Sequence, residues 1–112
     1  MSYVLKLRDV IVGRSSLETR DAERRTARGP FRPGLGWELV EPIFDLLPVD
    51  AAHASDEQRA RYRKARDTLA LSLHAPDGTL VDTARIDVVR DAASATGLTL
   101  DVGIVDEEFF AR

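Results

Sequence analysis

The sequence predicts an α+β domain with a mainly antiparallel sheet of about five strands and one principal helix. Three observations lead to this fold class: several short segments alternate apolar and polar residues, one segment combines helical periodicity with a capping signal, and strands and helices do not alternate regularly. A small half-open β-barrel is the alternative, because one helix covers little of such a sheet. The 112 residues, of which 44% are hydrophobic and 31% charged, fit a single domain over residues 1–112.

The first expected strand covers residues 3–12. From Tyr3 to Leu7 the residues alternate in the pattern of a strand with one buried face. Residues 10–12 are all apolar, so the strand is expected either to become buried on both faces or to shift register through a bulge at Asp9.

A second strand is expected from Trp37 to Leu47, where Trp37 and Leu39 share a face. Pro42 cannot donate a hydrogen bond to a neighbouring strand. It is therefore expected at a sheet edge or at a break between two shorter strands.

The clearest helical signal begins at Ser55 and runs to about residue 69. Ser55 and Gln58 have the spacing of a capping box, and Tyr62 lies on the face that is expected to pack against the sheet. A basic stripe lies on the flank of this face, and it consists of Arg59, Arg63 and Arg66.

The last third of the chain predicts three consecutive antiparallel strands. Residues 69–74 and 80–89 alternate on either side of "APDGT", in which Gly78 can take the positive φ of a hairpin turn. The third strand follows at residues 98–106, and a final turn of helix begins at Asp106.

Residues 13–36 are expected to form a long Arg-, Gly- and Pro-rich connection. Ser15 and Glu18 have capping-box spacing, so the first half is expected to form at most a marginal helix. The second half, "GPFRPGLG", is expected to be a rigid turn with Phe31 in the core. A cradle for an anion is the alternative reading, although the Walker spacing and the G-x-G-x-x-G pattern are both missing.

Several kinds of chemistry find no support in the sequence. The chain has no cysteine, which excludes disulfides, thiolate nucleophiles and cysteine-ligated metals. Ser15 lies in "GRSSL", which lacks the second glycine of a nucleophile elbow, and Asp50, His53 and Asp56 are expected in a solvated loop. No catalytic residue, metal or cofactor is therefore assigned. The N-terminal pattern is not that of a signal peptide and no segment is long and apolar enough to cross a membrane, so a cytoplasmic location is expected.

Charge is segregated along the chain, which has 16 basic and 19 acidic residues: basic residues gather in 14–34 and 59–67. This pattern favours a non-enzymatic binding or assembly module, which self-associates or docks on a protein partner through segment 13–36. The residues expected to bind the partner or an anion are Arg14, Arg20, Arg24, Arg25, Arg28, Arg32, Arg59, Arg63 and Arg66.

Two alternatives to this function stay open. One is a small enzyme or ligand-binding domain with a pocket between sheet and helix. The other is a nucleic-acid-binding domain, which requires the arginines of both basic segments to lie on one side of the protein.

Overall fold

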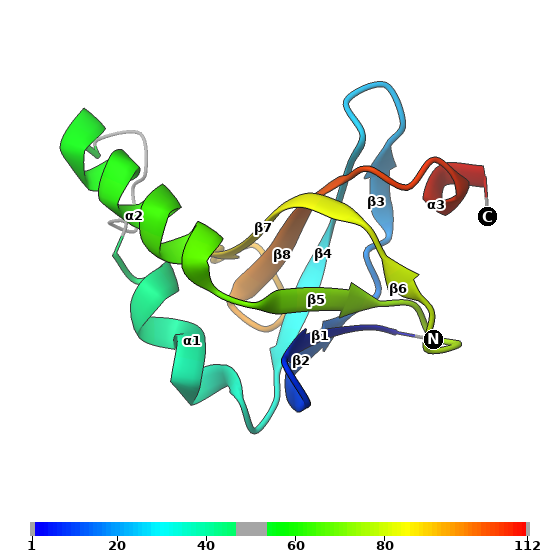
Figure 1. Cartoon of the computed structure of the whole chain (residues 1–112), viewed down its shortest axis with the longest axis horizontal. Coiled ribbons are helices and arrows are strands. Elements are labelled where there is room, and N and C mark those ends of the chain that lie inside the picture. Colours follow the sequence, from blue (N-terminus) through cyan, green and yellow to red (C-terminus); the bar gives the residue numbers. More distant parts are fainter. Residues whose placement is uncertain (1, 47–53, 112) are drawn as a thin grey trace.

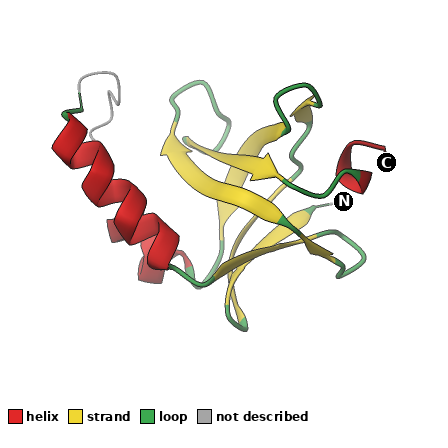
Figure 2. Ribbon diagram, turned by 45° about the horizontal axis from the view of Figure 1, so that its top comes forward, coloured by secondary structure: helices red, strands yellow, loops and turns green. Residues whose placement is uncertain are grey.

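The computed structural model of the protein describes residues 2–46 and 54–111. It shows a mostly antiparallel sheet of eight strands that curls into a nearly closed barrel, with short helices beside it (Figure 1 and Figure 2). The strands are β1 (Tyr3–Leu7), β2 (Val10–Ser15), β3 (Thr19–Asp21), β4 (Thr26–Pro33), β5 (Leu71–His74), β6 (Leu80–Val81), β7 (Thr83–Arg90) and β8 (Leu98–Ile104). The helices are α1 (Trp37–Phe44), α2 (Asp56–Thr68) and α3 (Glu108–Ala111).

A bend at Asp82 brings the two ends of the sheet together. The strand order is β6-β5-β1-β2-β4-β8-β7, with β3 paired to β4 outside this path. Only Asp82 separates β6 from β7, so one stretch of chain supplies both ends of the order. The architecture is consistent with the barrel alternative, and the expected count of about five strands is too low.

The single strand expected over residues 3–12 is a hairpin in the structure. β1 and β2 pair in antiparallel fashion and are joined by a turn at Arg8 and Asp9, where Arg8 has a φ of 56°. The register irregularity lies between Leu5 and Lys6 and not at Asp9. Alternation does not reveal the reversal, because both arms of a hairpin can direct apolar residues into the same core.

The prediction of a strand from Trp37 to Leu47 is wrong, because residues 37–44 form α1. Leu47 itself lies outside the described residues. The buried residues of α1 are Trp37, Val40 and Phe44, whose spacing of three and four is helical. Pro42 lies inside the helix, where it has no N–H to donate, and α1 is only eight residues long.

Residues 13–36, expected to be a connection, are mostly strand: they complete β2 and form β3 and β4. The expected marginal helix is absent from this segment, and Ser15 does not cap one; its buried hydroxyl accepts the N–H of Leu17 at 3.2 Å. Phe31 is fully buried, as expected. Along β4 the buried residues Gly29 and Phe31 alternate with residues that face outward. The alternation is hard to read in sequence because Gly29, Pro30 and Pro33 occupy three of the eight positions of β4.

Several predicted elements of the second half are confirmed. The N-terminus of α2 carries the complete capping box of Ser55 and Gln58. The hairpin turn between β5 and β6 contains Gly78 at a φ of 92°. The third strand corresponds to β8, and the final helical turn, α3, buries Phe109.

A chain of aromatic rings connects the barrel core to α1 and α2. The ring centroids of Phe31 and Trp37 are 5.3 Å apart, those of Trp37 and Phe44 are 5.8 Å apart, and those of Phe44 and Tyr62 are 6.3 Å apart. Such contacts contribute beyond simple burial of area. They fix α2 beside the barrel, which is where Figure 2 shows it, and they hold Tyr62 next to the sheet.

Candidate binding site

A pocket of about 320 Å³ lies between α2 and the outer face of β7 and β8. We call it the helix–sheet groove. The lining residues are Arg59, Tyr62, Arg63, Arg66, Asp87, Val89 and Asp101.

Strand alternation and register place the acidic residues of this groove. On β7, Ile86 and Val88 are buried in the barrel core, so Asp87 faces outward between them. Asp87 is the register partner of Asp101 on β8, and Asp101 is the partner of Arg28 on β4. A row of charged side chains therefore crosses three strands and ends beneath α2.

Asp87 accepts more hydrogen bonds than any other carboxylate that lines the groove. Its carboxylate accepts hydrogen bonds from the Tyr62 hydroxyl at 2.5 Å, from Arg66 at 2.8 Å and from Arg85 at 2.7 Å. Burial alone would raise the pKa of Asp87, but these three hydrogen bonds outweigh burial and lower the pKa below its ordinary value. Asp87 is therefore a fixed negative charge at neutral pH.

Tyr62 supports the same network from the helix. It is 5% exposed, and its burial, the hydrogen bond to Asp87 and the negative charge of Asp87 together raise the pKa of its hydroxyl. The hydroxyl therefore stays protonated and donates to Asp87, and the ring is covered by Phe44 and Arg66.

The arginines extend this network along the sheet. Arg85 also donates to Asp101 at 3.2 Å, and the Arg28 Nε atom lies 3.6 Å from an Asp101 carboxylate oxygen. Arg66 joins Asp87 to Asp67, with a side chain that is 13% exposed. Asp87 and Asp101 are thus each shared between two arginines.

The exposed guanidinium groups are those that a ligand can reach. Arg28 is 51% exposed and has only the long contact to Asp101, while Arg63 lines the groove without an ion pair to any of the described residues. Arginine forks bind carboxylates and phosphates through paired N–H groups. This arrangement can therefore hold an anion above a sheet whose own acids are already neutralised.

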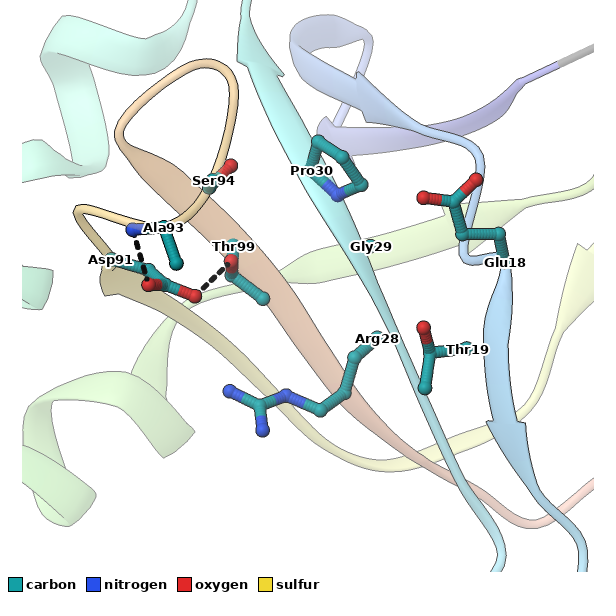
Figure 3. A pocket seen from close by; sticks show the side chains of 9 residues that line it. All are labelled: Glu18, Thr19, Arg28, Gly29, Pro30, Asp91, Ala93, Ser94 and Thr99. Atoms are coloured by element: carbon teal, nitrogen blue, oxygen red, sulfur yellow. Dashed lines mark hydrogen bonds between the residues drawn. The ribbon is translucent and has the colours of Figure 1, made fainter.

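A second pocket, of about 250 Å³, has Arg28 in its lining (Figure 3). Figure 3 shows the Arg28 side chain extending from β4, with Thr19 of β3 on one side and Thr99 of β8 on the other. Asp91 closes the far wall, where it accepts the Ala93 N–H at 2.9 Å and the Thr99 hydroxyl at 3.1 Å. The two pockets share no lining residue, and the link between them is the 3.6 Å contact of Arg28 in the second pocket with Asp101 in the helix–sheet groove.

The structure divides the arginines singled out in the sequence into three groups. The first group consists of Arg59, Arg63 and Arg66, which line the helix–sheet groove, and of Arg28, which lies beside the groove in contact with Asp101. Only Arg28 in this group comes from segment 13–36. A nucleic-acid-binding surface requires the arginines of both basic segments to lie on one side of the protein. Of the arginines in segment 13–36, only Arg28 lies beside those of α2.

The second group lies at the β3–β4 end of the barrel and is occupied by contacts within the chain. Arg20 donates to the Leu17 and Phe109 carbonyls and stacks 4.4 Å from the centroid of the Phe109 ring. Arg24 pairs with a carboxylate of its own hairpin, and Arg25 pairs with one in the segment before α3. These residues hold the hairpin and the C-terminal segment in place.

The third group consists of Arg14 and Arg32, which are register partners on β2 and β4. Both are exposed on the outside of the barrel, away from the helix–sheet groove. Two like charges directly opposite each other on paired strands repel, so this pair does not stabilise the sheet.

The sequence reasoning missed Arg85, Asp87 and Asp101 as members of the site. Alternation along residues 80–89 does place Arg85 and Asp87 on one face of a strand, opposite the apolar positions. The register that brings Asp101 beside Asp87, and α2 above both, is a tertiary property that this alternation does not contain. Asp50 and His53, considered as metal ligands, lie outside the described residues, and the described residues contain no cluster of three metal-binding side chains.

Within the described ranges, no helix has the length and apolar character needed to cross a membrane. No protein-family model, curated protein or solved structure matches the chain, so the site is interpreted from its own residues.

Proposed function

We propose that the protein is a non-enzymatic binding module that docks on an acidic segment of a protein partner through the helix–sheet groove. One observation carries the proposal: Arg63 lines the groove without an ion pair to any of the described residues, while Asp87 and Asp101 in the same lining are already bonded. Arg28, which is 51% exposed and lies 3.6 Å from Asp101, adds a second reachable guanidinium group beside the groove.

The charge states of the groove support binding rather than catalysis. A lowered pKa keeps Asp87 ionised, and a raised pKa keeps Tyr62 protonated. A general acid or base works best when its pKa lies near the working pH. Neither group meets this requirement, whereas fixed charges are well suited to recognition.

The shape of the surface supports an extended ligand. Arg28 of the second pocket contacts Asp101 of the groove, so the two pockets are neighbours, and Val89 contributes an apolar wall to the groove beside the arginines. An acidic peptide can place carboxylates on Arg63 and Arg28 and apolar side chains between them. Nucleic acid is the less favoured ligand, because Tyr62, the aromatic residue of the groove, is buried and offers no face for a base to stack on.

A small anionic ligand is the second candidate, since a pocket does lie between sheet and helix. It differs from the peptide in the length of surface used. A small anion needs only the arginines of the groove, whereas a peptide also contacts Arg28.

Fluorescence anisotropy with a labelled glutamate-rich peptide, and a glutamine-rich peptide of equal length as control, tests the proposal. Arg63→Ala and Arg28→Ala should each weaken binding of the acidic peptide about tenfold, the equivalent of about 1.4 kcal/mol. Arg14→Ala is the matched control, because Arg14 is exposed but lies outside the groove. Binding should weaken as salt is raised.

Three outcomes would change the conclusion. If Arg14→Ala weakens binding of the acidic peptide as much as the groove variants do, the peptide responds only to the net charge of the protein. Loss in the Arg63 variant with no effect of Arg28→Ala would favour the small anion. Tighter binding of a single-stranded oligonucleotide than of the acidic peptide would favour nucleic acid.

A further inference from the structure

A separate apolar surface lies at the end of the barrel where the β1–β2 turn meets α1. Leu35 is 98% exposed, Leu39 is 61% exposed and Val10 is 42% exposed. Single exposed apolar residues are common on soluble proteins, but a cluster of them marks an interaction site. We call these three residues the apolar face.

A groove of about 380 Å³ adjoins the apolar face. Its walls come from the β1–β2 hairpin, from α1 and from the segment that joins α2 to β5, and Figure 1 shows these parts gathered at the same end of the molecule. Its lining residues are Leu7, Arg8, Val10, Leu39, Thr68, Leu69 and Ala70. Val10 and Leu39 belong to both features, so a protruding leucine and an apolar groove lie side by side.

Backbone hydrogen bonds to β2 hold the turn that carries Leu35. The N–H of Gly34 donates to the Val12 carbonyl at 2.7 Å, and that of Gly36 donates to the Ile11 carbonyl at 2.8 Å. A Cβ at Gly36 would lie 2.7 Å from a Val10 methyl group, so the turn is pressed against β2. Because the turn is already fixed, burying Leu35 in a partner costs little additional ordering.

The charges around the groove are complementary to each other. Arg8 lies on the groove wall, and Glu38 is exposed beside Leu39 on α1. Neither has an ion-pair partner among the residues that the structure describes. In a two-fold arrangement every contact occurs twice, so an Arg8–Glu38 ion pair between two copies would form on both sides of the axis.

We propose that the apolar face is the contact between two copies of this chain, related by a two-fold axis, with Leu35 of each copy seated in the groove of the other. A second copy of the chain is the expected partner because this end of the barrel is self-complementary. It carries the protruding leucine, the groove that can receive a leucine, and both signs of charge. This surface does not include the arginines of the helix–sheet groove, and the dimer is independent of the function proposed above.

Sedimentation velocity of the full chain at several concentrations and at low and high salt tests the dimer. The wild type should sediment at twice the chain mass of 12.4 kDa, and high salt should not dissociate it, because apolar burial is strengthened rather than screened by salt. Leu35→Glu should sediment as a single chain. Leu80→Glu is the matched control, since Leu80 is 54% exposed on β6 and is absent from the groove lining.

A charge exchange tests the two-fold geometry itself. Arg8→Glu and Glu38→Arg should each weaken the dimer at least about tenfold at low salt, and the double variant should restore it. Circular dichroism establishes that each variant is folded.

A wild type that stays a single chain at every concentration overturns the proposal, and so does a Leu35→Glu variant that still dimerises. A double variant as weak as the single ones overturns the two-fold arrangement. Loss of acidic-peptide binding in the arginine variants has no bearing on these results, so the two proposals fail separately.

Discussion

Replacing Asp87 with asparagine tests whether one buried carboxylate organises the helix–sheet groove. The side chains of Asp87 and Arg66 are each 13% exposed, and the carboxylate accepts three hydrogen bonds of 2.5 to 2.8 Å. Removing one partner of a buried ion pair costs about 3–5 kcal/mol. We expect the lower end, about 3 kcal/mol, because Arg66 and Arg85 each keep a second carboxylate partner.

The same substitution should change how the free energy of unfolding depends on pH. The folded pKa of Asp87 lies below its ordinary value of 3.8, so its stabilising contribution is fully present above that value and is lost as the pH falls through the folded pKa. The free energies of unfolding of wild type and Asp87→Asn should therefore differ by the full amount at neutral pH. The two values should converge as the pH falls well below about 4.

Urea unfolding at neutral and at acidic pH measures both effects. Asp67→Asn is the matched control, because Asp67 pairs with the same Arg66 but is 65% exposed, and it should cost at most about 1 kcal/mol. If Asp87→Asn lowers the free energy of unfolding as little as the control does, the network described here is contradicted. If the free energies of wild type and variant differ equally at both pH values, the charge of the carboxylate is not the cause of the lost stability.

Two further substitutions test backbone packing by urea unfolding. Gly13→Ala should cost about 1–3 kcal/mol, since a Cβ at Gly13 would lie 2.2 Å from the Phe31 ring and 2.6 Å from the Arg32 carbonyl oxygen. Gly103→Ala, where the nearest atom would be 3.4 Å away, is its control and should cost at most about 1 kcal/mol. Gly78→Val should cost about 1 kcal/mol or more from its φ of 92° alone, because a Cβ there would contact nothing within 4 Å. An unchanged free energy of unfolding in the Gly13 or Gly78 variant would contradict the corresponding reasoning.

The parts of the fold that could be predicted from sequence are those determined by local chemistry. Ser55 and Gln58 specify the start of α2 through their own side chains, and Gly78 marks a turn that few other residues tolerate. The parts that were missed depend on what a segment packs against. Trp37 and Leu39 alternate as in a strand, yet Leu39 is exposed and Val40 takes its place in the core.

The candidate site was only partly visible for the same reason. The stripe of Arg59, Arg63 and Arg66 follows from helical spacing and is found at the groove. What the stripe faces could not be predicted, because the acidic residues beneath it come from β7 and β8, and the register of these two strands is a property of the folded sheet. Segment 13–36 appeared to be a free arginine-rich connection because Gly29 and its prolines conceal the pattern of β4.

The closure of the sheet at Asp82 also bears on aggregation. An open sheet presents unpaired amide and carbonyl groups along both edges, and these groups recruit strands from other molecules into fibres. Here the two ends of the strand order belong to one continuous stretch of chain. Among the described residues, the strand outside this path is β3, which is three residues long and carries Arg20 and Asp21. Each of these two ends, β6 and β7, pairs on one side only, so a strand from another copy would have to enter between the two ends of the same sheet to extend it.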